Sequence, residues 1–342
     1  MKQLKTIVAF VAGLFAFTSV QAGEMSVSGS MQATYQSEVD DVTGNPLGLN
    51  TDLTFSGSVD TDFGTATMSL ATDGTFLGES GADHTYSLAT DMGTFTIGNA
   101  GDSGNAVDDI TPTAFEEANG SGSGTYSVDF GSGMDGSMSL KYGNSDVMGT
   151  GISVSYSYYP KLDGATNNEK AASADNNNAT KSAQSINVGI PLSGVPVVGD
   201  SPLGGAKITL GYEKSDAMAS SFQPKEGGTV AVVLPVGPLS VGYQKKAYAA
   251  AATANGTKTF YKDDIYGIAY AINDDLALSW NVYQSDQHNN DGTNTEQETK
   301  SLNIAYTVGG LTLGFADAKT SNAGYTAATD DDTRTFSIKT AF

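Results

Sequence analysis

The chain has 342 residues, 39% of them hydrophobic, no cysteine, and a formal net charge of −21 at pH 7. The absence of cysteine excludes disulfides, a lipid-anchored cysteine and thiolate metal sites. The large excess of acidic residues argues against nucleic acid and other anionic partners.

The first 22 residues predict a secretory signal peptide. Lys2 and Lys5 precede an apolar run over 7–17, and Val20-Gln21-Ala22 has the small-residue character of a cleavage site. This run is too short for a membrane-spanning helix, and no other stretch reaches the ~18 apolar residues that such a helix needs. We therefore expect an exported protein with a single domain over 23–342.

Segments of about ten residues with period-two alternation then follow along the chain. Between 25 and 35 the odd positions are apolar or small and the even positions are Ser, Gln or Thr, and the pattern recurs at 49–60, 276–282 and 302–308. The polar positions are mostly Ser, Thr, Asn, Gly and Ala, which suit a water-filled lumen better than the outer surface of a soluble sheet. Because lipid cannot satisfy backbone polar groups, a spanning sheet must close on itself. The sequence therefore predicts an all-β fold, a transmembrane antiparallel β-barrel.

The connections alternate between short and long, as expected for periplasmic turns and external loops. The short ones are 61–64, 91–93, 131–136, 237–238, 273–275 and 309–310, and the long ones are 37–48, 100–122, 160–184, 216–227, 249–260, 286–297 and 320–331. Roughly seventeen segments fit the strand pattern, whereas single-chain bacterial barrels have an even number of strands. The ambiguity lies at Tyr126–Phe130, Ser137–Gly143 and Ile152–Tyr159. We predict sixteen strands, with eighteen as the alternative.

Three motifs carry a resemblance to a known family. The chain ends on Phe342, with Phe336 and Ile338 on the same face, which resembles the terminal strand that the outer-membrane assembly machinery recognises. Met92–Asn99, followed by an acidic loop, is similar to the strand that precedes the third loop of general porins. Glu24–Gly29 is similar to the first strand of alphaproteobacterial porins. The chain thus resembles the general porins of Gram-negative bacteria.

The resemblance implies a homotrimer in the outer membrane, surrounded by lipid and lipopolysaccharide, that passes small hydrophilic solutes. It also implies that the loop 100–122 folds inward and narrows the channel. The acidic residues of this loop are Asp102, Asp108, Asp109, Glu116 and Glu117. As a constriction they would favour cations over anions. The alternative is an exposed acidic loop without a role in selectivity.

Few basic residues are predicted at positions where they could balance the negative charge of such a constriction. The polar faces of the first four predicted strands hold no Lys or Arg, and the single arginine, Arg334, has outward parity near the external rim. The basic residues with lumenal parity are Lys141, Lys207, Lys246 and Lys339. Of these, Lys207 and Lys339 are expected near the periplasmic end, away from mid-barrel. The pore is therefore expected to be negative along its length, although a register slip of one residue would invert every assignment.

The sequence gives little support for a catalytic site or a metal site. His84, near a strand start, and His288, in a predicted external loop, have no Ser–His–acid spacing, so an outer-membrane hydrolase is disfavoured. The acidic clusters are Asp40-Asp41, Asp263-Asp264 and Asp330–Asp332, which we expect to be solvated loop tips. Calcium binding in these loops is the alternative, and no other cofactor is expected.

Two other functional classes were weighed against a diffusion channel. An eighteen-stranded substrate-specific channel for sugars should show a ladder of lumenal aromatic residues, whereas this chain has few at lumenal parity, Tyr283 being an exception. A secreted, soluble all-β binding or adhesion protein is the more distant alternative.

The outward faces of the first three strands carry small residues and Met, including Gly29 and Gly57, and are predicted to form the subunit interface. Tyr and Trp on later strands indicate lipid contact.

Overall fold

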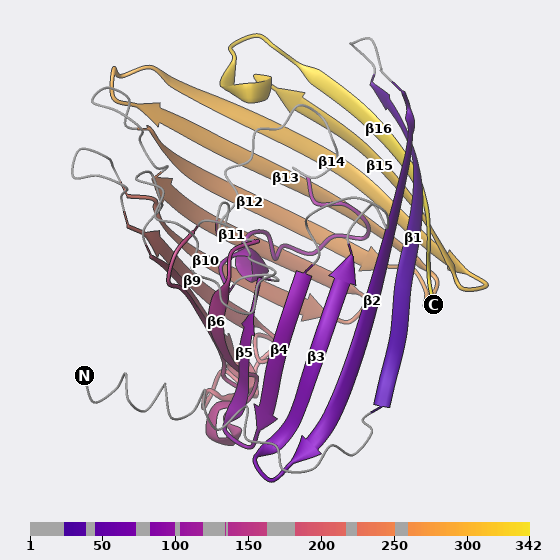
Figure 1. The fold of residues 1–342 in the computed structure, drawn as a ribbon. Helices are drawn as coiled ribbons and strands as arrows, with labels where there is room; N and C mark the ends of the chain where they lie inside the picture. Colours follow the sequence, from indigo (N-terminus) through magenta and orange to yellow (C-terminus); the bar gives the residue numbers. More distant parts are fainter. Residues whose placement is uncertain are drawn as a thin grey trace.

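The computed structural model describes residues 24–38, 45–72, 83–99, 103–118, 134, 136–162, 182–216, 224–249 and 259–342. Sixteen strands in these residues pair antiparallel with their sequence neighbours and close into one barrel (Figure 1). The prediction of sixteen strands is thus confirmed, and eighteen is wrong. The expected signal peptide and the candidate strand Tyr126–Phe130 lie outside the described residues.

The strands are β1 (Glu24–Glu38), β2 (Leu47–Thr61), β3 (Gly64–Thr72), β4 (Asp83–Thr90), β5 (Gly93–Gly98), β6 (Ser139–Asn144), β7 (Ser153–Tyr159), β8 (Ala183–Pro191), β9 (Lys207–Ser215), β10 (Glu226–Val236), β11 (Leu239–Ala249), β12 (Thr259–Ala271), β13 (Leu276–Asn289), β14 (Asn294–Val308), β15 (Leu311–Ser321) and β16 (Asp331–Ala341). Four short 3-10 helices lie in the described connections: η1 (Asn105–Val107), η3 (Val147–Gly149), η4 (Leu192–Gly194) and η5 (Ala323–Tyr325). Among the described residues, no helix has the length and apolar character needed to cross a membrane.

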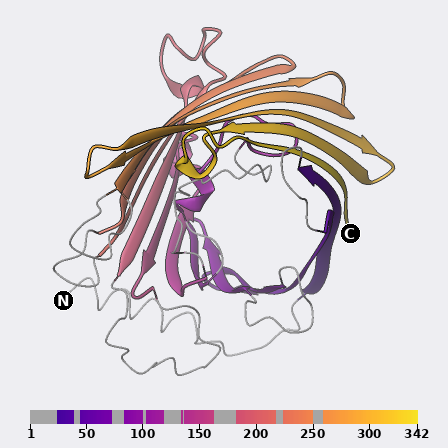
Figure 2. The same cartoon turned by 90° about the horizontal axis from the view of Figure 1, so that it is seen from above.

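The two faces of the sheet differ as the alternation predicted. On β13 the side chains of Ser279, Asn281 and Ser285 are buried on the polar face, whereas Trp280, on the opposite face, is 46% exposed. Figure 2 shows the strands arranged in a ring around a central space. The polar face carries the side chains that bond to the segment 103–118, and large apolar side chains of the opposite face are exposed. So many exposed large apolar side chains suit contact with lipid better than contact with water.

The turns at one end of the barrel are tight and depend on glycine. Gly309 and Gly310 both have positive φ, 56° and 82°, between β14 and β15, and Gly237 has a φ of 59° between β10 and β11. Two connections at this end are longer: residues 145–152, which contain η3, join β6 to β7, and residues 192–206, which begin with η4, join β8 to β9.

Two predicted boundaries at the opposite end are wrong. The region 286–297 is mostly strand, because β13 and β14 continue their pairing as far as His288 and Asn294. Asp263 and Asp264 are not at a loop tip either: both lie within β12 and point to opposite faces. Near the rim, polar residues alternate with Tyr and Lys. A search for alternating apolar and polar residues therefore does not detect that the strands continue there.

The barrel closes between β1 and β16. Their pairing runs from Glu38 opposite Thr333 to Ser30 opposite Ala341. Beyond the last strand residue, the backbone N–H groups of Gly29 and Phe342 each donate to the other residue's carbonyl at 2.9 Å. The Phe342 side chain is 69% exposed on the outer surface. The final residue therefore supplies the last rung of the closure and an apolar group that faces outward.

Deletion of Phe342 is expected to reduce the amount of folded barrel. The deletion removes two backbone hydrogen bonds at the seam and the terminal aromatic side chain that resembles the assembly signal. The measurement is the fraction of heat-modifiable protein in outer-membrane extracts at native expression, with Phe342→Tyr as the control that keeps the ring. Wild-type levels of folded protein from the deletion variant would contradict this role.

Candidate functional site

The segment 103–118 packs against the polar face of the barrel wall. Gln244 of β11 is central to this contact: its side-chain oxygen accepts from the N–H of Ile110 at 2.9 Å, and its amide nitrogen donates to the carbonyls of Val107 and Asp108 at 2.8 and 2.9 Å. The segment makes further hydrogen bonds to the polar side chains of Ser155, Ser157, Asn187, Ser279, Asn281 and Asn303. One segment thus bridges strands from β7 to β14 across the ring.

Three glycines on the polar face make room for this segment. A Cβ atom at Gly242 would lie 2.4 Å from the Pro112 ring, and one at Gly267 would lie 2.7 Å from the Pro112 carbonyl oxygen. A Cβ at Gly314 would lie 2.4 Å from the Phe115 ring. Glycine inside a strand often marks close approach of another chain segment. These positions were the signal in the sequence that could have located the contact.

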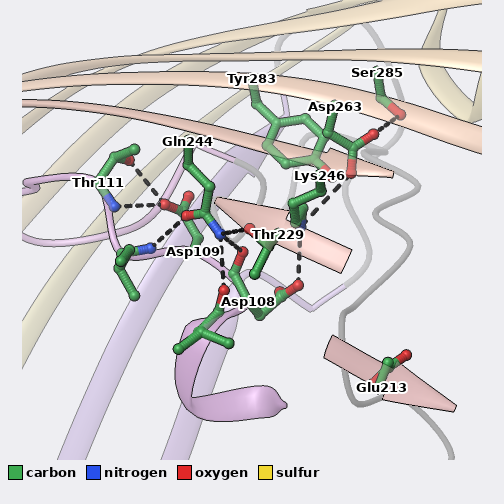
Figure 3. Close-up of polar contacts among 12 residues, drawn as sticks. Asp108, Asp109, Thr111, Glu213, Thr229, Gln244, Lys246, Asp263, Tyr283 and Ser285 are labelled. Atoms are coloured by element: carbon green, nitrogen blue, oxygen red, sulfur yellow. Dashed lines mark hydrogen bonds and ion pairs between the residues drawn. The ribbon is translucent and has the colours of Figure 1, made fainter. Parts of the chain in front are cut away.

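Lys246 ties the segment to the wall by a buried ion network (Figure 3). Its Nζ lies 2.9 Å from Oδ1 of Asp108 in the segment and 3.7 Å from Oδ2 of Asp263 on β12. Asp263 also accepts hydrogen bonds from the hydroxyls of Tyr283 at 2.9 Å and Ser285 at 2.5 Å. Lys246 and Asp263 are each 1% exposed. A cation between two buried carboxylates satisfies charges that would otherwise be costly to bury.

Lys246 therefore has a different role from the one that its position in the sequence suggested. It has the expected lumenal parity, but it is neutralised by direct contact with Asp108 rather than standing free opposite the acidic loop. Tyr283 likewise is fully buried beside Ala118 and Ile265 and is not available to a passing solute. Sequence reasoning missed this network because its members are far apart in the chain. Lys246 is 138 positions from Asp108, and Tyr283 is 20 positions from Asp263.

The other three acidic residues of the segment are partly buried and carry raised pKa values. Burial, together with the negative charges of Asp109 and Asp108, raises the pKa of Glu117 to about 7. Burial also raises the pKa of Glu116, although the charge of Lys339 opposes that shift. For Asp109, burial raises the pKa against the lowering effect of its two hydrogen bonds from Thr111. Asp102 lies outside the described residues.

Lys207 is the first residue of β9 and Lys339 is near the end of β16, so both lie toward the end with tight turns. Both are also close to the segment. Lys207 lines a cavity of about 420 Å³ together with Ala106, Val107 and Ile110. Lys339 is close enough for its charge to act on Glu116. Lys141 is on the polar face of β6, opposite Ser157.

The remaining candidates lie apart from this cluster. Arg334 is on the outer face of β16 and pairs with Asp317 at 2.9 Å. The backbone N–H of His84 donates to Asn99 at the start of β4. His288 lies in β13 and not in a loop, and its ring stacks on Phe260 at 4.5 Å. Within the described part of the chain, no three His, Cys, Asp or Glu residues gather as a metal site. Asp40-Asp41 lie outside that part.

Comparison with solved structures relates the barrel to a set of known folds. OmpT of Vibrio cholerae, an outer membrane protein, superposes with a TM-score of 0.68 at 10% identity over 96% of this chain and all of that one. An anion-selective porin from Comamonas acidovorans gives 0.63 at 12% over 94% and 100%. OmpF of Salmonella typhi gives 0.63 at 13% over 94% and 98%. The fold is that of the outer-membrane porins.

Sequence comparison adds nothing to this assignment. No protein-family model matches the chain. No curated protein matches it either. The porin fold also includes an anion-selective member, so the fold by itself does not determine which ions pass. Selectivity has to be argued from this chain's own charges.

Replacing Lys246 by Met is expected to loosen the segment 103–118. The change leaves the carboxylates of Asp108 and Asp263 buried without their cation, and breaking such a pair costs about 3–5 kcal/mol. The variant should unfold at lower temperature and be cleaved faster by protease within 103–118. The triple variant Lys246→Met, Asp108→Asn, Asp263→Asn should recover most of the loss, because no charge is then left buried. Wild-type protease resistance in the single variant would contradict the anchoring role.

Proposed function

We propose that this protein is an outer-membrane porin whose channel, narrowed by the loop 100–122, passes small hydrophilic solutes by diffusion and prefers cations. The observation that carries the proposal is the polar contact of 103–118 with strands from β7 to β14. A segment that spans the polar face of a closed barrel occupies part of its cross-section. The predicted signal peptide over 1–22 supports export to the outer membrane.

The charge balance near this segment supports a preference for cations. Asp108 and Asp263 share the single positive charge of Lys246, which leaves that cluster negative. Asp109, Glu116 and Glu117 add three further carboxylates. The positive charges of Lys207 and Lys339 oppose them. On the polar face of β1 to β5, opposite the segment, the sequence has no Lys or Arg. A negative constriction lowers the barrier for cations and raises it for anions.

The polar lining fits small hydrophilic solutes rather than a dedicated sugar path. The polar face of β1 carries the half-buried side chains of Ser30, Gln32 and Thr34. Tyr283, the aromatic residue that could have belonged to a sugar-binding ladder, is covered. Nothing in this arrangement calls for catalysis or for a cofactor, and calcium binding at the acidic rim residues stays a prediction.

A single-channel recording in a planar bilayer tests the proposal. Wild-type protein in a gradient of KCl should give discrete conductance steps and a reversal potential of the sign for K⁺ over Cl⁻. Protein that inserts but conducts no current would contradict the channel. A reversal potential of the sign for Cl⁻ would contradict the assigned selectivity and leave the channel intact.

The cation preference should rise with pH near neutrality. Glu117, with a pKa of about 7, is largely protonated at about pH 6 and largely ionised at about pH 8, so the pore gains negative charge across this interval. In about 0.1 M salt, where the Debye length is about 10 Å, the reversal potential should shift toward K⁺ as pH rises. Glu117→Gln should remove most of that shift, whereas the outward Glu298→Gln should keep it. An equal shift in the Glu117 variant would assign the titration to another group.

The assembly is proposed to be a homotrimer that packs through the N-terminal strands. One of the similar structures is a trimer form of OmpT. The outer faces of β1 and β3 carry Met25, 81% exposed, and Met68, 63% exposed, beside Gly57, where an added Cβ meets no atom closer than 3.9 Å. Gly29 does not suit a test of the interface, because an added Cβ there would lie 2.8 Å from the protein's own Phe342 ring.

Gly57→Trp is therefore expected to weaken the trimer and leave the barrel folded. The indole would stand on a wall where another copy approaches closely, as small residues allow between membrane segments. The control is Val230→Trp, on the outer face of β10, which should dissociate at the wild-type temperature. The measurement is trimer dissociation on heating in mild detergent. If both variants behave alike, the interface lies elsewhere.

A further inference from the structure

The cavity that Lys207 lines lies between the segment 103–118 and the polar face of β7 to β10. Its lining includes Ser153, the first residue of β7, and Lys207, the first residue of β9. Pro235, near the end of β10, also lines it. All three residues lie toward the end with tight turns. The cavity of about 420 Å³ is therefore on that side of the segment, where a solute that crosses the pore would pass.

The charge of this cavity is opposite to that of the protein as a whole. The chain has 17 Lys and Arg against 38 Asp and Glu. Among the described residues, however, the cavity lining includes Lys207 and no carboxylate. The Lys207 side chain lies over Gly189, where an added Cβ would be 2.6 Å from its Cε and 3.1 Å from its Nζ. The glycine thus makes room for an ammonium group at the cavity wall, and Lys207 is exposed, so a solute can reach it.

Apolar side chains lie beside this ammonium group. Val233 of β10 is the direct cross-strand partner of Lys207, and both side chains are on the polar face of the sheet. Cβ atoms of such partners are about 4.5–5.5 Å apart. Val107 and Ile110 of the segment also line the cavity. A mostly apolar pocket with few polar groups is typical of sites for small molecules. A cation next to an apolar surface is suited to an anion that carries an apolar tail.

We propose that this cavity binds monocarboxylates with a short alkyl tail, such as butanoate. The inference rests on the proposed channel and names a class of solute for it. The carboxylate accepts from Lys207, and the tail packs against Val107, Ile110 and Val233. A single cation balances a single negative charge, whereas the second charge of a dicarboxylate would be left near the acidic residues of the segment. Lys207 repels an alkylammonium ion. The site would give one class of anion a path through a pore that otherwise prefers cations.

The test measures butanoate binding to the purified protein in detergent by saturation-transfer NMR of the ligand. Lys207→Gln should bind about tenfold more weakly, because it loses a hydrogen bond between charged groups. The control is Lys339→Gln, which makes the same change of charge at the same end of the barrel but outside the cavity lining, and it should bind as the wild type does. From acetate through propanoate to butanoate, binding to the wild type should tighten about two- to fourfold per methylene.

Two further variants test the cavity without changing its charge. Gly205 lines the cavity, and an added Cβ there would lie 3.5 Å from the Pro235 carbonyl oxygen, which is ordinary contact. Gly205→Leu should fill the cavity and abolish binding while Lys207 is intact. Val233→Thr should weaken the gain per methylene, whereas Val232→Thr, on the outer face of β10, should keep it. Each variant is first confirmed as a folded, heat-modifiable barrel.

The proposal would be overturned by any of three results: no binding of butanoate to the wild type, wild-type affinity in Lys207→Gln or Gly205→Leu, or equal affinity for butylammonium. Binding in detergent does not require conduction. Single-channel conductance is recorded separately, so failure of the channel proposal is distinguishable from failure of the carboxylate site.

Discussion

Closure of the backbone hydrogen-bond network is the constraint on which the rest of this structure depends. A sheet in lipid has no water to satisfy an open edge, so β1 must pair with β16 and the last rung must be made by Phe342 itself. Once the ring is closed, every strand has one face toward the outside of the barrel and one toward its interior. The composition of the chain follows: large apolar side chains are exposed on its outside, and its inside carries many small polar side chains that leave room for a further segment.

The segment 103–118 is held in that room by both shape and charge. Gly242, Gly267 and Gly314 remove side-chain volume where the backbone of the segment approaches the wall. Lys246 then links the segment to β12 through Asp108 and Asp263. The network is buried and paired, whereas Glu116 and Glu117 are only partly buried and their charge is adjustable. Fixed anchoring and adjustable charge thus reside on neighbouring residues of one segment.

The sequence predicted what depends on local alternation and failed where contacts are long-range. Barrel closure and the tight turns at Gly237 and Gly309 follow from period two and turn chemistry. The count of sixteen strands also needed the rule that single-chain bacterial barrels have an even number. The extension of β13 through His288 was missed because the residues near the rim are polar on both faces of the strand. The Lys246–Asp108 contact was missed because parity gives the face of a residue but not the height at which a distant segment crosses it. For the same reason the sequence did not show that the segment passes close to Lys207 and Lys339.

The conductance of a channel that lacks residues 105–117 tests the central claim most directly. In 1 M KCl the Debye length is about 3 Å, so fixed charges are largely screened and conductance reports mainly the width of the narrowest section. If 103–118 narrows the pore, the shortened variant, confirmed as a folded heat-modifiable barrel, should show a larger single-channel conductance than the wild type. Equal or smaller conductance would contradict the assignment of this segment as the constriction.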